Sequence, residues 1–324
     1  MPKGKPTIPA RRATAPQEPR GILELDRFSE ATLSQWSSAS QDLDELSDVL
    51  HFGIEPERRR LRPELLTALQ ATPLTTMELS RWTRVVTYQY SLEPLSSAGS
   101  LKNIGGRFNA GVELDANTLN PWPALYLAED YETAFREKFQ MPHGELTEGL
   151  TPQELALEHG VSHATLFVKG HLSRVFDMTH IESLVSVAKV LSRIKMPARA
   201  KQIRTKLKMP SQSAVMVQTG KQLHDAALKH NWRIAPIQYG LPAPSHILAE
   251  LIHAAGFEAI LYQSTKGPGK CLAVFPDQLD GQSFVELIDK PPPAVKHPRL
   301  DIDTAFELTG WDTLPPQLRA RCQR

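Results

Sequence analysis

The stretch GGRFNAGVELDANTLNPWPALYLAEDYETAFREKF, residues 105–139, places three functional elements close together. A glycine-rich turn carries Arg107, the short apolar run ALYLAED predicts a strand that ends in Tyr126, and the helix predicted after it carries Glu137. Asp130 stands directly before that helix, where its side chain can cap the first turn. A purely structural segment seldom needs all three. We therefore predict a pocket here for a phosphorylated ligand that bears a ring.

Segments on either side predict further strands and a helix, which gives an α+β pattern. WTRVVTYQY alternates in the manner of a strand and places Arg84 on or beside it. ATLFVKGHLSRVFDMT predicts a strand that closes at Asp177. SHILAELIHAAGFEAILYQSTKGPGKCLAVF predicts a helix, a glycine stop and two strands joined by a glycine-rich turn, with Ser264 at the end of the first strand. Because pockets often open at strand ends, we group Arg84 and Ser264 with Arg107.

The N-terminal part of the chain carries no residues with evident chemistry. Residues 1–22 are rich in proline and basic residues and predict a disordered tail. Residues 23–78 predict a helical extension. Within it, Asp42 is expected to cap one helix and Pro63 to lie in the first turn of another.

Two insertions interrupt the central pattern, which we place at residues 79–290. The first, at about 141–162, is acidic and contains the capping box TPQE at 151–154. The second, at about 178–245, is basic and predicted to be helical; it is either a solvated insertion or a rim that attracts an anionic ligand. Residues 291–324 predict an extended linker and a short C-terminal element.

The composition is that of a water-soluble globular protein, with 41% hydrophobic residues, 23% charged residues and a net charge of +1. This balance gives no global field that favours nucleic acid or a membrane. Two cysteines are too few for a disulfide scaffold or a cysteine-based metal site. No apolar run is long enough to span a bilayer, and the N-terminus lacks the apolar core of a signal peptide. We expect a cytoplasmic protein without a metal.

Three familiar enzyme motifs are excluded. The turn STKGPGKC ends like a phosphate-binding P-loop, but it lacks the first glycine and carries cysteine in place of the hydroxyl residue that binds magnesium. No GxSxG sequence is present, which argues against a serine hydrolase. His159 and His163 are four residues apart but belong to no HExxH pattern, so a zinc site is not predicted.

The chemistry that the grouped side chains can perform is specific. Two arginines can clamp a diphosphate through charge-assisted hydrogen bonds, and a tyrosine ring can stack on a flat heterocycle. A glutamate can hold a ribose hydroxyl and stabilise positive charge at the anomeric carbon. Taken singly, Arg84 fits a surface ion pair, Glu137 an exposed helix residue, Tyr126 a core tyrosine and Ser264 a turn cap. Together they suit cleavage of an N-glycosidic bond in a dinucleotide.

The order and local sequence of these residues resemble the RES-domain family, which is named for its arginine, glutamate and serine. The matching segments are WTRVV, GGRFNAG, ALYLAEDYETAFREKF and GFEAILYQSTKGPGK, and the resemblance runs from about Arg81 to Phe275. It implies an ADP-ribosyltransferase-like split β-core surrounded by helices. It also implies a toxin of a toxin–antitoxin system that consumes NAD+ by hydrolysis or phosphorolysis.

The resemblance implies a catalytic group. Arg84 would grip the pyrophosphate of NAD+ or an incoming phosphate, and Tyr126 would stack against nicotinamide or its ribose. Glu137 would orient the ribose and support an oxocarbenium-like transition state. NAD+ is a substrate in this scheme, with inorganic phosphate as an optional co-substrate, and no cofactor is implied.

The same resemblance implies further substrate contacts. Arg107 would hold phosphate with Arg84, and Ser264 would fix the nicotinamide side or a phosphate oxygen. Lys266 is a weaker candidate for phosphate binding, as is Lys270; both lie in or beside a glycine turn that we expect to be mobile.

The partner and the acceptor stay open. The resemblance implies a cognate antitoxin or immunity protein that covers the cleft, with nucleic acid bound only indirectly through it and no membrane contact. One alternative is an ADP-ribosyltransferase that modifies a protein. An alternative of another class is a non-enzymatic module that binds an anion or nucleic acid through the basic insertion.

Overall fold

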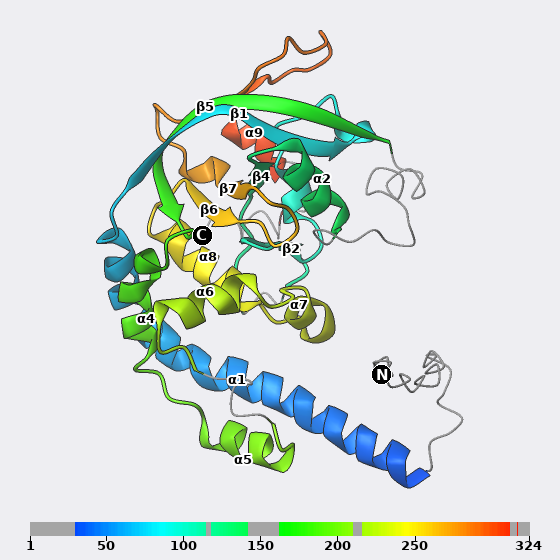
Figure 1. Ribbon diagram of the computed structural model, residues 1–324, viewed down its shortest axis with the longest axis vertical. Coiled ribbons are helices and arrows are strands. Elements are labelled where there is room, and N and C mark those ends of the chain that lie inside the picture. Colours follow the sequence, from blue (N-terminus) through cyan, green and yellow to red (C-terminus); the bar gives the residue numbers. More distant parts are fainter. Residues whose placement is uncertain (1–29, 115–117, 142–161, 210–215, 312–315, 317–324) are drawn as a thin grey trace, which may run out of the picture.

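The computed structural model describes residues 30–114, 118–141, 162–209, 216–311 and 316 (Figure 1). Its α-helices are α1 (Glu30–Gln70), α2 (Tyr131–Phe139), α4 (Val185–Leu191), α5 (Ala198–Lys206), α6 (Gly220–Leu228), α7 (Ile234–Tyr239), α8 (Pro244–Ala254) and α9 (Ala305–Thr309). Its strands are β1 (Thr75–Thr87), β2 (Gly105–Gly106), β3 (Asn109–Ala110), β4 (Leu125–Ala128), β5 (His163–Asp177), β6 (Ala259–Gln263), β7 (Lys270–Val274), β8 (Phe284–Leu287) and β9 (Arg299–Leu300).

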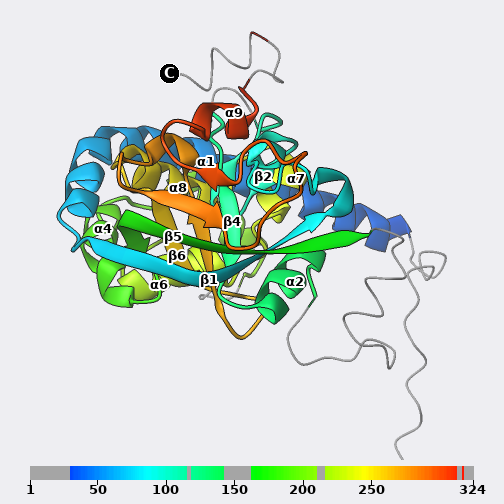
Figure 2. The same ribbon diagram turned by 90° about the horizontal axis from the view of Figure 1, so that it is seen from above.

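Seven of these strands form one sheet in the order β1-β4-β7-β6-β5-β8-β9. β1 also pairs with β5, so the pairings among β1, β4, β7, β6 and β5 close into a ring. Figure 2 shows the two long strands β1 and β5 running side by side. Every pairing in this sheet is antiparallel except that of β5 with β6. The predicted combination of helices with a sheet is confirmed.

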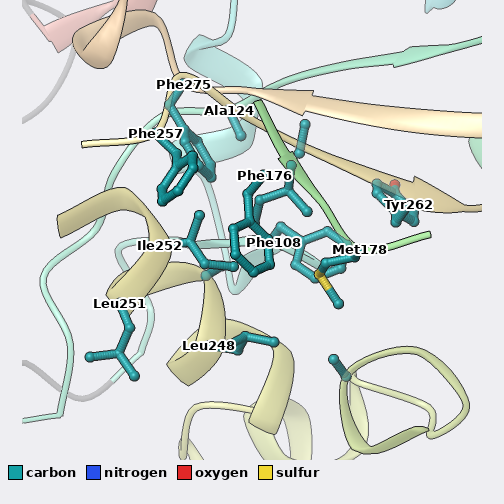
Figure 3. Packing of buried hydrophobic residues seen from close by; sticks show 14 of the residues in the cluster. Phe108, Ala124, Phe176, Met178, Leu248, Leu251, Ile252, Phe257, Tyr262 and Phe275 are labelled. Atoms are coloured by element: carbon teal, nitrogen blue, oxygen red, sulfur yellow. The ribbon is translucent and has the colours of Figure 1, made fainter. Parts of the chain in front are cut away.

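The central strands β4, β6 and β7 bury both of their faces. Alternate residues such as Leu125 and Leu127 pack toward β1, β5 and β8, whereas Ala128 and Ile260 belong to a second cluster that includes α4, α6 and α8. Figure 3 shows the aromatic part of this second cluster between the strands and α8. Because both faces are apolar, polar groups on these strands are restricted mainly to their ends.

Helix α1 is continuous through Pro56 and Pro63, so the prediction that Pro63 begins a helix is wrong. Proline removes one intrahelical hydrogen bond, but tertiary packing can compensate for that loss. Leu61, Leu65 and Leu69 are fully buried in the main core. The second half of the extension is therefore part of the domain core and not an appendage.

The predicted cap at Asp42 is also wrong, because Asp42 lies inside α1 and accepts a hydrogen bond from Lys206 at 2.7 Å. Two further basic residues of the insertion pair with α1: Arg199 bonds Glu45 at 2.5 and 2.7 Å, and Arg193 bonds Glu64. These three cations thus hold α4 and α5 against α1, where Figure 1 shows α5 alongside it. They do not form the anion-attracting rim that the basic composition allowed.

The C-terminal part contributes more than the predicted linker. β9 pairs with β8, and Leu300, Ala305 and Leu308 belong to the core cluster between the long strands and the central ones. The carbonyl of Leu308 also accepts hydrogen bonds from the backbone and hydroxyl of Ser97. The packed domain therefore continues beyond residue 290.

Two predicted segments lie outside the described residues. These are the N-terminal tail at 1–22 and nearly all of the acidic insertion at about 141–162, including its capping box. Among the helices that the structure does describe, none combines the length and apolar character needed to cross a bilayer.

The packing of α1 predicts a position-dependent cost of shortening its leucines. Leu65→Ala should lower the free energy of unfolding by about 2–5 kcal/mol, because it leaves a cavity in the core. Leu43→Ala, on the exposed side of the same helix, should change it by no more than about 0.5 kcal/mol. Urea unfolding followed by circular dichroism measures both. Equal effects would show that α1 is an independent appendage.

Candidate active site

A cavity of about 270 Å³ lies where β1, the β2–β3 hairpin, β4 and α2 meet the connection between α6 and α7. Arg84, Arg107, Tyr126 and Glu137, four of the residues predicted from the sequence, all line it. Segments far apart in the chain therefore converge as expected. Ser264 and Lys266 are not part of the lining.

Arg84 enters the cavity from β1 with its charge unopposed. Its Nη2 donates to the carbonyl of Ser96 at 2.7 Å, while its buried Nε has no hydrogen-bond partner among the described residues. Burial lowers the pKa of Arg84 to about 10, which leaves it protonated at neutral pH. No carboxylate in the described part of the chain forms an ion pair with it. A half-buried guanidinium in this state is a strong site for an anion.

Tyr126 presents its ring to the cavity while its hydroxyl is occupied. The hydroxyl accepts from the backbone N–H of Phe108 and donates to Oδ1 of Asn109, each at 2.9 Å. Burial raises the pKa of this phenol, so it stays neutral. Gly106 packs so closely that a Cβ there would lie 2.4 Å from the hydroxyl oxygen. Tyr126 lies within β4 and does not end it, contrary to the prediction.

Arg107 is positioned by the end of a helix in the basic insertion. Its Nη1 donates to the carbonyls of Ala227 and Leu228, both at 3.1 Å, in the last turn of α6. Its Nη2 donates to Oγ1 of Thr265 at 3.1 Å. The partial negative charge at the helix C-terminus favours a guanidinium here. The insertion therefore orients one of the predicted phosphate-binding residues.

Glu137 and Ser264 meet through a direct hydrogen bond. The Ser264 hydroxyl donates to Oε1 of Glu137 at 2.7 Å and accepts from the backbone N–H groups of Lys266 and Gly267 at 3.0 and 2.8 Å. Since Ser264 does not line the cavity, its contact is with the glutamate and not with the cavity itself. Ser264 thus fixes one oxygen of Glu137, the one acidic side chain among the described residues of the lining.

The glycine turn after Ser264 is held against the start of α2 by several contacts. Asp130 caps α2 by accepting from the Thr133 N–H at 2.8 Å, as predicted. The Gly269 N–H donates to the Thr133 hydroxyl at 2.8 Å, and a Cβ at Gly269 would lie 2.1 Å from Asp130 Oδ2. Lys270 donates its own backbone N–H to Glu129 and, like Lys266, does not line the cavity.

The charged and aromatic lining residues Lys138, Trp232 and Arg233 were not singled out from the sequence. Lys138 follows Glu137 on α2, and burial together with the charge of Arg84 lowers its pKa. Trp232 and Arg233 come from the α6–α7 connection. The basic composition of the second insertion predicted many cations in this region, but composition cannot tell which of them reaches the cavity.

The charge of the lining is strongly unbalanced. Arg84, Arg107, Lys138 and Arg233 face one carboxylate, that of Glu137. None of the four cations takes part in an ion pair within the residues that the structure describes. Four positive charges in a confined space repel one another unless an anion binds between them. The cavity is therefore suited to a ligand with at least two negative charges and a flat ring.

His246 holds the β2–β3 hairpin in place through a hydrogen bond to Gly106. Its Nδ1 accepts from the Ala243 N–H at 3.3 Å, so the ring proton lies on Nε2, which donates to the Gly106 carbonyl at 2.7 Å. The side chain is completely buried, and burial lowers its pKa to about 4. Neutral His246 thus acts as a fixed donor that holds Gly106 against Tyr126.

In the described part of the chain, no three His, Cys, Asp or Glu side chains cluster in a way that could hold a metal ion. The arrangement around the cavity can bind a polyanion, stack a ring and stabilise a developing positive charge with one carboxylate. Within the part of the lining that the structure describes, Glu137 has no second carboxylate with which to form a pair of the glycosidase type.

Comparison with known proteins gives one family and one solved structure. A family model described as RES domain matches residues 81–303. A chain in the crystal structure of the M. tuberculosis MbcT-MbcA toxin–antitoxin complex aligns with a TM-score of 0.39 and 12% identity, over 76% of this chain and 97% of that chain. None of the curated proteins matches the sequence.

Buried His246 predicts a defined pH dependence of stability. Its pKa is about 4 in the folded protein against 6.5 for an unperturbed histidine, so the unfolded chain binds the proton first as the pH falls. The free-energy advantage of the wild type over His246→Gln should therefore shrink by up to about 3 kcal/mol between pH 6.5 and pH 4. Urea unfolding at several pH values measures this. Parallel pH profiles for the two proteins would contradict it.

Proposed function

The chain belongs to the RES domain family, and from this membership we propose that it is an enzyme that cleaves the N-glycosidic bond between nicotinamide and ribose in NAD+. The observation that carries the proposal is the unbalanced lining of the cavity, with four cations around one carboxylate. NAD+ combines the matching features. Its pyrophosphate carries two negative charges, and its nicotinamide is a flat, positively charged ring that leaves as a neutral molecule.

We assign the binding roles from the geometry. Arg84, unpaired and half-buried, binds the pyrophosphate, and Arg107 binds a second phosphate oxygen from its position at the end of α6. Tyr126 offers its ring for stacking because its hydroxyl is already engaged. These contacts orient the dinucleotide with its ribose toward Glu137.

The reaction needs one well-placed negative charge. When the bond from C1′ to nicotinamide breaks, its electron pair leaves with the ring and neutralises it, and the ribose gains oxocarbenium character. The Glu137 carboxylate stabilises this positive charge, and the Ser264 hydroxyl keeps the carboxylate in place at 2.7 Å. An oxygen of the acceptor then bonds to C1′. Water as acceptor gives ADP-ribose and releases a proton, whereas inorganic phosphate gives a phosphorylated ADP-ribose.

The proposal extends to the biological setting. We infer a toxin of a toxin–antitoxin system whose cleft is covered by a cognate antitoxin or immunity protein. This part rests on the family and not on the geometry of the cavity. The ring of strands around a buried core supports an ADP-ribosyltransferase-like split β-core. Transfer of ADP-ribose to a protein uses the same groups, and the acceptor decides between the two activities.

Replacing the single carboxylate should stop catalysis and leave the fold intact. Glu137→Gln should lower kcat for nicotinamide release by at least roughly 100-fold, because the neutral amide cannot stabilise the positive ribose. Nicotinamide is measured by chromatography after incubation with NAD+, with and without phosphate, and phosphorus NMR identifies the second product.

The matched control is Glu132→Gln, which changes an exposed glutamate on the same helix. It should retain wild-type turnover. Turnover by Glu137→Gln at the wild-type rate would rule out the proposed role of Glu137. No nicotinamide release by the wild type in either buffer would overturn simple NAD+ cleavage; modification of a protein acceptor would then indicate a transferase, and steeply salt-dependent anion binding alone a non-enzymatic module.

Ser264 should act on the rate more than on binding. Ser264→Ala removes the hydrogen bond to Glu137, so kcat should fall about 10- to 100-fold while KM for NAD+ changes little. Steady-state kinetics of nicotinamide release give both constants. Ser264→Thr, which keeps a hydroxyl, should recover much of the rate. A large rise in KM with unchanged kcat would instead show that Ser264 binds substrate directly.

A further inference from the structure

We propose that Arg233, supplied by the α6–α7 connection of the basic insertion, forms with Arg107 a second phosphate-binding subsite, separate from that of Arg84 and Lys138. The inference rests on the proposed function, which it deepens by dividing the anion site in two. A subsite of this kind takes a tetrahedral oxyanion. The oxyanion is either the second phosphoryl group of the dinucleotide or a free inorganic phosphate.

Among the described residues, the hydrogen bond and the ring contact that hold Arg233 in the cavity are both with neutral groups. Its Nη1 donates to Oε1 of Gln140 at 2.8 Å, and its guanidinium lies 4.6 Å from the centroid of the Trp232 ring. No carboxylate of the described residues pairs with it. Burial and the neighbouring charge of Arg107 lower the pKa of Arg233, and the Glu137 carboxylate offsets this only in part. The protein therefore brings a half-buried cation close to another cation, which an anionic ligand would stabilise.

The four cations fall into two pairs that stand on different supports. Arg84 on β1 is anchored to Ser96, and Lys138 lies on α2, which packs against β1. Arg107 is anchored to α6 and to Thr265, and Arg233 lies in the connection that follows α6. Because both pairs line one cavity, a ligand with two anionic groups can engage both at once.

Buried residues of the fold fix the position of Arg233. Trp232 is buried, and its ring packs edge-to-face against His246 with centroids 5.3 Å apart. His246 in turn donates to the carbonyl of Gly106, next to Arg107. The two arginines of the subsite are therefore linked through one buried tryptophan and one buried histidine. Gln140 completes the mounting from the end of α2, where it adopts a left-handed conformation with φ of 59°.

Binding of simple anions tests the subsite without relying on turnover. Titration calorimetry with inorganic pyrophosphate and with inorganic phosphate is compared for the wild type, Arg233→Ala and Arg233→Gln. The neutral variants should weaken binding of at least one of these anions about tenfold or more, because charge-assisted hydrogen bonds are lost. Arg233→Gln keeps a donor for Gln140 and covers the case in which the alanine variant does not fold, which circular dichroism reports.

Lys221→Ala is the matched control. It removes one positive charge from α6, where Lys221 is exposed and paired with Asp225 outside the cavity, and should leave anion binding unchanged. An equal loss in Lys221→Ala and Arg233→Gln would overturn the proposal, since it would reveal a general charge effect. Unchanged binding of both anions in a folded Arg233 variant would also overturn it.

Kinetics separate the two sources of the oxyanion. A higher KM for NAD+ in phosphate-free buffer assigns the subsite to the dinucleotide. A loss of phosphate-dependent product with an unchanged KM for NAD+ assigns it to free phosphate. Either result supports the subsite. If the wild type binds pyrophosphate through Arg233 but never cleaves NAD+, the subsite stands and the proposed function fails. If an Arg233 variant is fully active and binds anions normally, the proposed function stands and the subsite fails.

Discussion

The architecture depends on the burial of both faces of β4, β6 and β7. Leucine, valine, alanine and isoleucine fill these strands, and the long strands cover one face while helices cover the other. A charged group in the middle of such a strand would lose its hydration without compensation. Tyr126 is tolerated there because Asn109 and the Phe108 N–H satisfy its hydroxyl. The charged groups consequently gather where β1, α2 and the hairpin meet the strand edges.

This gathering makes the site electrostatically unfavourable without a ligand. Three cations of the insertion pair with a glutamate or aspartate of α1, whereas the four cations of the cavity share one carboxylate among the described lining residues. Folding energy from the two core clusters offsets that repulsion. An enzyme that must bind a polyanion benefits from such an arrangement, because groups already fixed toward the ligand do not have to reorganise during the reaction. The cations that pair with α1 therefore stabilise the fold, whereas the cations of the cavity are available to bind a ligand.

Sequence patterns predicted the parts of the site that are encoded locally. The strand with Arg84, the cap at Asp130 and the helix with Glu137 follow from propensity and spacing within about one element each. The contact between Ser264 and Glu137 spans 127 residues, so the sequence could place both at a pocket but could not say that they bind each other. Arg233 was missed for the same reason: its position depends on the packing of Trp232 against His246. The prediction that Pro63 begins a helix failed because burial of α1 outweighs the local preference of proline.

The basic insertion connects the N-terminal helix to the cavity. Its first half, α4 and α5, is held to α1 by ion pairs and by the cluster of Leu46, Ala200 and Ile203. Its second half provides the α6 carbonyls that hold Arg107 and the connection that carries Arg233. α6 packs against α4 and α8, and α1 packs against both of those helices. The end of α6 and the connection after it thus place Arg107 and Arg233 in the lining, so the helices outside the sheet belong to the architecture of the site.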